Sequence, residues 1–217
     1  MTKQSVSGFF DVYARDFNAI YGTRNTPWSN LINKLFRQSM RKRFEMTLTA
    51  CDPVAGRSVL DIGTGPGHYA ITLAQRGAGR VLGLDFAQGM IEVARRNAEQ
   101  AGVADRCTWT FGDFTTFQTD ETFDYCIVMG FMDYIEKPRE VIDKVLSLTN
   151  RRAMFSFPVD GGLLAWQRKR RYRKRCELYM YTEQQVRDLF AHQTEFDVRI
   201  DRIGRDFFVM AERKNSK

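Results

Sequence analysis

Hydrophobic residues in the first fifty positions recur at three- and four-residue spacing, which is typical of one face of an amphipathic helix. One such series covers residues 9–21 and another covers residues 31–48. Thr26 followed by Pro27 is a suitable start for the second helix, because proline is tolerated in the first turn. We therefore expect residues 1–51 to form a helical N-terminal region.

Beyond Arg57 the pattern changes to short apolar segments that alternate with helical ones. This alternation predicts an α/β fold with an open parallel sheet and helices on both faces. The last two segments are joined only by a short turn at Gly204, so they must pair antiparallel. The expected strands are 58–61, 80–84, 107–111, 123–128, 152–157, 196–203 and 206–211, and the expected helices are 68–76, 88–101, 137–148 and 182–191.

The composition is that of a globular chain with a packed core. It has 217 residues, 43% of them hydrophobic and 27% charged, which fits one domain with room for a small cap. No stretch approaches the roughly 18 apolar residues of a membrane span, and the start lacks a hydrophobic signal core. Four scattered cysteines and two histidines favour reduced thiols and no metal site. We expect a cytoplasmic protein.

The net charge of +7 is concentrated in one place. Residues 166–175, which we call the basic cassette, read WQRKRRYRKR and carry seven positive charges, while the rest of the chain is balanced. The cassette follows the fifth expected strand and is expected to belong to a basic cap over residues 160–180. It could be a solvated helix face, an anion site for the substrate, or a surface for RNA or an anionic membrane, with Trp166 and Tyr172 supplying stacking contacts.

Candidate ligand-binding residues lie at the carboxyl ends of the expected strands, where open α/β sheets bind their ligands. Gly63, Gly65 and Gly67 follow the first strand and allow a tight turn and close backbone approach. Their Gly-x-Gly-x-Gly spacing differs from the Gly-x-Gly-x-x-Gly of nicotinamide binders. Asp61, which precedes them, suits the ammonium of an amino-acid moiety better than a pyrophosphate. Asp85 ends the second strand and can accept hydrogen bonds from ribose hydroxyls.

Two further segments follow the third and fourth expected strands. Gly112, Asp113 and Phe114 could meet an adenine, with Asp113 accepting from its amino group and Phe86 or Phe114 packing on the ring. An exposed turn aspartate and core phenylalanines remain the alternative. Residues 129–134 follow the fourth strand, and there Asp133 could equally be a helix cap or a surface acid.

Residues 58–156 resemble class I methyltransferases that depend on S-adenosylmethionine (SAM). Their glycine-rich motif, ribose-binding acid and adenine-side acid are matched by residues 61–67, Asp85 and Asp113. The resemblance implies a Rossmann-like, seven-stranded sheet with an antiparallel last strand, and a SAM-dependent methyltransferase domain over residues 52–217 preceded by a lid over residues 1–51. The residues expected to bind SAM are Asp61, Gly63, Thr64, Gly65, Gly67, Asp85, Phe86, Met90, Gly112, Asp113, Phe114, Met129 and Gly130.

A looser resemblance joins the chain to magnesium-protoporphyrin O-methyltransferases. It rests on Ile20-Tyr21-Gly22 and on residues 152–158 followed by a basic stretch. Tyr21 matches a tyrosine near the reacting group of that family, but Asp133 stands where the family has a histidine. We therefore carry over only the architecture, with an N-terminal lid and a cap after the fifth strand.

Methyl transfer from a sulfonium is an in-line displacement that needs alignment, exclusion of water and, for some acceptors, a base. The expected catalytic residues are Asp133, as base or positioning group, and Tyr21 and Tyr134, as orienting groups. The expected acceptor is a small molecule, glycan or lipid precursor, anionic and methylated at oxygen. The alternatives are an RNA methyltransferase that uses the basic cassette, a non-catalytic SAM-binding module, and a nicotinamide oxidoreductase, which the glycine spacing disfavours.

Overall fold

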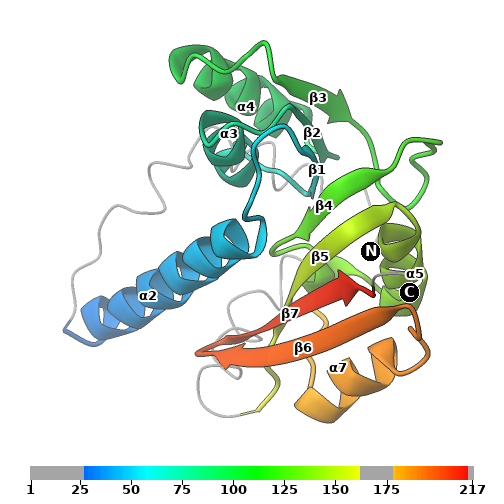
Figure 1. Cartoon of the computed structure of the whole chain (residues 1–217). Helices are drawn as coiled ribbons and strands as arrows, with labels where there is room; N and C mark the ends of the chain where they lie inside the picture. The colour runs from blue at the N-terminus through cyan, green and yellow to red at the C-terminus, as the bar shows by residue number, and fades with distance from the viewer. Residues whose placement is uncertain (1–26, 162–177, 215–217) are drawn as a thin grey trace.

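The computed structural model describes residues 27–161 and 178–214 of the chain. Within them a seven-stranded sheet has the strand order β3-β2-β1-β4-β5-β7-β6 (Figure 1). The pairs among the first five strands of this order are parallel, and β7 is antiparallel to both β5 and β6. The expected mixed sheet with an antiparallel last strand is confirmed. The strands are β1 (Ser58–Ile62), β2 (Arg80–Asp85), β3 (Cys107–Phe111), β4 (Phe123–Val128), β5 (Thr149–Pro158), β6 (Phe196–Ile203) and β7 (Asp206–Arg213).

The helices begin and end close to where the sequence pattern placed them. They are α2 (Pro27–Ala50), α3 (His68–Gln75), α4 (Gln88–Gln100), α5 (Pro138–Ser147) and α7 (Glu183–Phe190). Pro27 and Pro138 occupy first turns, and Thr182 caps α7 in a reciprocal capping box with Gln185. Gly102, with a φ of 69°, follows α4 as expected of a helix stop.

One strand boundary and one short element differ most from the sequence-based prediction. Strand β5 begins at Thr149 and not at Arg152, because Thr149 already pairs with Phe123 of β4. Residues 150–152 are polar or basic, so the apolar pattern that predicts a strand does not reach back to Thr149. A single 3₁₀ turn, η1 (Met132–Tyr134), was also not predicted, since three residues are too few to show a periodicity.

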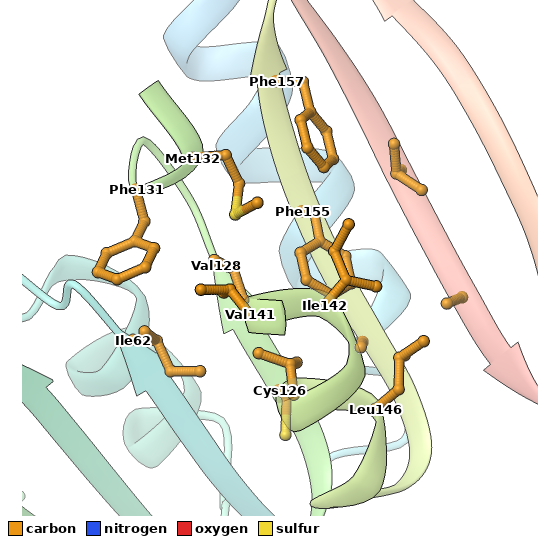
Figure 2. Close-up of a cluster of buried hydrophobic side chains, with 14 of the residues drawn as sticks. Ile62, Cys126, Val128, Phe131, Met132, Val141, Ile142, Leu146, Phe155 and Phe157 are labelled. Atoms are coloured by element: carbon orange, nitrogen blue, oxygen red, sulfur yellow. The ribbon is translucent and has the colours of Figure 1, made fainter. Parts of the chain in front are cut away.

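Alternate residues of the buried strands face two separate hydrophobic cores, as the period of two requires. On β4, Cys126 and Val128 face the core beneath α5 and α7, while Tyr125 and Ile127 face the core that includes residues of α2, α3 and α4. Figure 2 shows the first of these cores, in which Val141 of α5 lies among side chains from β4 and β5. The helices on the two faces thus hold the sheet between them and leave its strand ends for other contacts.

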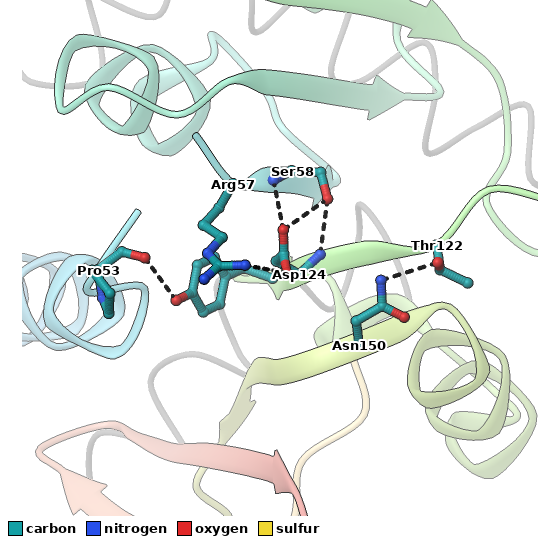
Figure 3. Close-up of polar contacts among 7 residues, drawn as sticks. Pro53, Arg57, Ser58, Thr122, Asp124 and Asn150 are labelled. Carbon is teal, nitrogen blue, oxygen red and sulfur yellow. Dashed lines mark hydrogen bonds and ion pairs between the residues drawn. The ribbon is translucent and has the colours of Figure 1, made fainter. Parts of the chain in front are cut away.

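A polar cluster fixes the amino ends of β1 and β4, the two strands at which the sheet order reverses (Figure 3). The Asp124 carboxylate accepts hydrogen bonds from the Ser58 backbone N–H at 3.0 Å and from the Ser58 hydroxyl at 3.3 Å. The Ser58 hydroxyl oxygen accepts in turn from the Asp124 N–H at 3.0 Å. These contacts tie the two strands together at the edge opposite the candidate ligand site.

Helix α2 joins the sheet through its C-terminal half. The ring of Phe44 packs on Tyr69 of α3 at a centroid distance of 5.0 Å, and Ser39 lies directly against Gly204 in the turn between β6 and β7. Of the proposed N-terminal lid, the structure describes only this helix. In the described part of the chain no helix is both long and apolar enough to cross a membrane.

Candidate functional site

The carboxyl ends of β1 and β4 lie side by side at the point where the strand order changes direction, so the loops that follow them diverge. Ligands of open α/β sheets bind in the crevice that such divergence leaves. The glycine segment 63–67 follows β1, and residues 129–134 follow β4. The fold therefore brings together the two segments that the sequence marked as cofactor-side and acceptor-side.

All three glycines of the loop have the left-handed backbone conformation, with φ values of 68° at Gly63, 54° at Gly65 and 82° at Gly67. Side-chain-bearing residues rarely adopt these angles. A Cβ on Gly65 would meet no atom of the described residues within 4 Å, whereas a Cβ on Gly67 would lie 2.7 Å from Trp109. Gly65 thus presents an open backbone surface to a ligand, while Gly67 serves the packing of β3 against α3.

Asp61 lies beneath this loop and is 1% exposed. Its carboxylate accepts a hydrogen bond from the Thr64 hydroxyl at 2.6 Å, and it also accepts from the backbone N–H of Ala70. Burial raises the pKa of Asp61 to about 7, against the opposing effect of these two hydrogen bonds. In this structure the carboxylate therefore holds the loop to the first turn of α3.

Asp85 lies across from the loop at the end of β2. One carboxylate oxygen accepts from the Gly65 N–H at 2.8 Å and the other from the Ala87 N–H at 2.9 Å. A carboxylate oxygen can accept more than one hydrogen bond. The side chain thus joins the glycine loop to the start of α4, beside the surface that Gly65 leaves open.

The predicted adenine-side residues divide into two groups. A Cβ on Gly112 would meet no atom of the described residues within 4 Å. The Asp113 carboxylate accepts hydrogen bonds from the Thr115 N–H and hydroxyl, both at 2.8 Å. Phe114 is only 1% exposed and packs edge-on against Phe131 in the core beneath α5. The structure therefore places Phe114 in the core, which was the alternative to an adenine contact. Asp113 lies at the carboxyl ends of the strands. Phe86 is half-buried, and Met90 and Met129 are buried.

Residues 129–134 form a tight turn that ends in η1. Gly130 has a φ of 71°, and its N–H donates to the Ser156 hydroxyl at 2.8 Å. Phe131 lies over Gly63, because a Cβ on that glycine would be 2.9 Å from the ring. Asp133 is 3% exposed, and its backbone carbonyl accepts from the Tyr179 N–H; Tyr134 is half-buried. The buried position of Asp133 is not that of a surface acid.

Sequence reasoning missed Arg43 of α2, which reaches this turn from the N-terminal helix. Its guanidinium donates to Ser156 and to Asp206, each at 3.4 Å, and its hydrogen bond with Tyr69 connects it to α3. The available signal was the polar series Ser39, Arg43 and Thr47, whose spacing of four places them on one face of the helix. That face is turned toward the sheet.

Several predicted features lie outside the described residues: the helical series at residues 9–21 with Tyr21, and the basic cassette at residues 166–175 with most of the cap over residues 160–180. Within residues 27–161 and 178–214, no three His, Cys, Asp or Glu side chains are grouped as metal ligands would be. The cysteines described there, Cys51, Cys107 and Cys126, are buried free thiols. Burial raises the pKa of Cys107 to about 11 and that of Cys126 to about 12, which keeps both thiols protonated at neutral pH.

The parallel strands, the antiparallel β7 and the glycine loop beside Asp85 define the fold of class I SAM-dependent methyltransferases. Residues 59–151 match the family model described as a methyltransferase domain. Over these residues the chain matches this class of proteins, and its fold is the one that the sequence resemblance predicts.

Among the relatives, a demethylmenaquinone methyltransferase of Clavibacter sepedonicus is 32% identical over 142 residues, which are 65% of this chain and 52% of that protein. A ubiquinone biosynthesis O-methyltransferase of Actinobacillus pleuropneumoniae is 34% identical over 97 residues, 43% of this chain and 41% of the relative. The chain spans about half the length of the curated relatives it matches, or less.

A solved structure extends the similarity over nearly the whole chain. Magnesium protoporphyrin IX methyltransferase from Synechocystis, determined with S-adenosylhomocysteine (SAH) bound, superposes with a TM-score of 0.77 and 22% identity, covering 98% of this chain and 100% of that one. The same enzyme was also solved with SAM. At this identity the similarity concerns the fold, and it agrees with the architectural resemblance seen in the sequence.

Proposed function

We propose that this protein transfers a methyl group from SAM to an oxygen atom of a small-molecule acceptor that carries an anionic group. The observation that supports this most directly is the open left-handed glycine loop joined to Asp85 at the point where the strand order reverses. The quinone-precursor methyltransferases among the relatives favour a small molecule as the acceptor.

The residues present fit such a cofactor. Gly65 and Gly112 have open space where a side chain would otherwise lie, so a ligand can approach the backbone on both sides of Asp85. In the proposal, the Asp85 carboxylate binds the ribose hydroxyls and Asp113 accepts from the adenine amino group. The backbone of Gly63, Thr64 and Gly65 lies against the methionine moiety, while Asp61 holds that loop in place from below.

The acceptor side of the site is assigned to residues 129–134. SAM, held by the glycine loop and Asp85, would supply an electrophilic methyl group; the acceptor oxygen would take it as the carbon–sulfur bond breaks with its electron pair left on sulfur. Asp133, which is buried and follows Gly130 by three residues, takes the hydroxyl proton of the acceptor or orients that hydroxyl, and Tyr134 helps to orient it. Tyr21 and the basic cassette are proposed to complete the acceptor side.

Calorimetry with SAM, SAH and NADH tests the cofactor assignment. We expect SAH to bind with a dissociation constant on the order of micromolar and NADH not to bind, because the glycine spacing and Asp61 do not suit a pyrophosphate. Binding of NADH alone would end the proposal.

Methyl transfer is then measured as release of SAH with a panel of acceptors: caffeic acid, a demethylated menaquinol, magnesium protoporphyrin IX and bulk transfer RNA. Turnover of a small acceptor supports the proposal, and turnover of the RNA alone would replace it by RNA methylation through the basic cassette. Binding of SAM without turnover of any acceptor would favour a non-catalytic module. Asp133→Asn is expected to lower turnover about a hundredfold while SAH affinity persists, and Asp143→Asn, an exposed acid of α5, is the control.

A further inference from the structure

Arg43 connects helix α2 to β5, β7, α3 and the turn after β4 at the candidate site. Its side chain is 13% exposed. It contacts Ser156 of β5, Asp206 of β7 and Tyr69 of α3, and it lies about 4 Å from where a Cβ of Gly130 would be. In the sequence, Ser156 and Asp206 are more than a hundred residues away from Arg43, so only the fold brings them together.

A hydrogen-bonded chain runs from this guanidinium to the turn after β4. The Ser156 hydroxyl oxygen accepts from Arg43 at 3.4 Å and from the backbone N–H of Gly130 at 2.8 Å. Gly130 has a left-handed conformation, and Asp133 follows it by three residues within the same turn. Any displacement of Arg43 is therefore transmitted through one oxygen atom to the segment that carries the proposed base.

The charges around Arg43 also connect it to Asp133. Burial by itself would lower the pKa of the guanidinium, but Tyr69 and Asp206, and to a smaller extent Asp133, more than compensate, so its pKa is raised. The titratable groups that face it come from α3 (Tyr69), η1 (Asp133) and β7 (Asp206). Arg43 thus stays positive at every accessible pH and supplies the cation next to two buried carboxylates.

As a device for stability alone, this arrangement is a poor one. Its contacts with Ser156 and Asp206 are long, each at 3.4 Å. Among the described residues, the Arg43 Nε is a buried side-chain nitrogen without a hydrogen-bond partner. A buried ion pair with such geometry does not recover the cost of desolvation, and apolar residues of similar volume are often as stable or more stable. The position of the charge is therefore better explained by the site than by the core.

We propose that Arg43 is a positioning residue for methyl transfer: through Ser156 and its positive charge, it holds the turn from Gly130 to Asp133 in the arrangement needed by the acceptor. This proposal rests on the proposed function, since it assigns the turn to the acceptor side. It also makes α2 part of the active site, because Arg43 fixes the position of this helix relative to the acceptor turn.

The test compares four variants of the full chain. Arg43→Met removes the charge and keeps the apolar length, and Arg43→Lys restores a charge that can reach Ser156 or Asp206. Ser156→Ala removes the bridging oxygen. Arg41→Met is the matched control, because Arg41 lies on the same helix, is 81% exposed and pairs only with Glu45 among the described residues. Exposed pairs of this kind contribute little.

Three quantities are measured: SAH affinity by calorimetry, kcat and KM with the acceptor panel, and amide hydrogen exchange of the peptide covering residues 129–134 in the SAH complex. For Arg43→Met and Ser156→Ala we expect kcat to fall about tenfold or more, SAH affinity to stay within about twofold, and exchange to rise about tenfold in this peptide but not across α2. Arg43→Lys should recover most of both losses, and Arg41→Met should match the unmodified protein.

A folded Arg43→Met protein with unchanged kcat and unchanged exchange at residues 129–134 would overturn the proposal, as would a uniform rise of exchange over the whole domain with no recovery by lysine. If the unmodified protein binds SAH but turns over no acceptor, the proposed function fails on its own. The exchange measurement and its recovery by lysine then still decide whether Arg43 positions this turn.

Discussion

The backbone N–H of Gly65, in the loop after β1, donates a hydrogen bond at 2.8 Å to the carboxylate of Asp85, the last residue of β2. The other oxygen of the same carboxylate accepts from Ala87 at the start of α4. The Asp85 side chain therefore sets the spacing between the glycine loop and the carboxyl end of β2. The proposed ribose site is built on this contact.

Replacement of Asp85 by asparagine is expected to weaken SAH binding about tenfold or more and to destabilise the fold by about 1–3 kcal/mol. An amide offers one acceptor atom and one donor group, so one of the two N–H groups would face an N–H₂ and lose its partner. Calorimetry with SAH and urea denaturation measure the two effects. Asp105→Asn is the control, because Asp105 is 77% exposed. Unchanged affinity in a folded Asp85→Asn protein would argue against the assigned role.

The glycines of the loop are expected to respond to alanine in different ways. Gly67→Ala should destabilise the protein by about 2 kcal/mol or more, since its Cβ would overlap Trp109 in addition to the left-handed strain. Gly65→Ala should cost only about 1 kcal/mol, because its Cβ would meet open space, but it should reduce SAH affinity by occupying the ligand's side of the loop. Thermal unfolding and calorimetry of both variants separate stability from binding. Equal effects of the two variants on SAH affinity would contradict the division of roles.

The stability of the unliganded protein is expected to depend on the ionisation of Asp61. Burial raises the pKa of Asp61 to about 7, well above the value of about 3.9 for an unfolded chain. Between these values the folded state holds a proton that the unfolded state has released, so this group lowers stability as pH rises from about 4 to about 7. The slope is at most about 1.4 kcal/mol per pH unit.

Urea denaturation of the unmodified protein and of Asp61→Asn between pH 5 and pH 8 isolates this contribution. The difference in unfolding free energy between the two proteins should shift in favour of the unmodified protein as the pH falls. Asp105→Asn serves again as the control and should show no such change. Parallel profiles for the unmodified protein and Asp61→Asn would show that Asp61 is ionised throughout this range.

Ser58→Ala is expected to destabilise the sheet by about 1–2 kcal/mol without changing SAH affinity. The Ser58 hydroxyl both donates to the Asp124 carboxylate and accepts from the Asp124 N–H, and alanine leaves that N–H without its partner. The contact lies at the amino ends of β1 and β4, the edge opposite the glycine loop (Figure 3). Ser147→Ala, in the exposed last turn of α5, should change stability by less than about 0.5 kcal/mol. A loss of SAH affinity in Ser58→Ala would show that the two edges are coupled.

Much of the fold could be predicted from the sequence because its signals are local. Apolar periods of 2 and 3.6 located the strands and most helix boundaries, and the short turn at Gly204 fixed the antiparallel ending. The glycine loop and Asp85 were found for the same reason, since strand-to-helix turns have characteristic residues. The early start of β5 and the η1 turn were missed because polar residues and a three-residue element carry no such period.

The environment of individual site residues could not be predicted in this way. Phe114 follows the third strand directly and looked suited to an adenine, yet it packs in the core beneath α5, with Lys144 over its ring. Asp61 was interpreted as a partner for a ligand's ammonium, and in the structure its carboxylate is satisfied beneath the loop. In both cases the backbone position was predicted correctly and the direction of the side chain was decided by its neighbours.

The sequence by itself determined the order of the elements, the class of the fold and the loop that marks the cofactor side. Only the tertiary structure decided that Arg43, Ser156 and Asp206 meet beside Gly130. In the sequence, Arg43 is more than a hundred positions away from both Ser156 and Asp206. Local periodicity depends on neighbours within a few residues, whereas a polar cluster of this kind exists only after distant strand ends have been packed together.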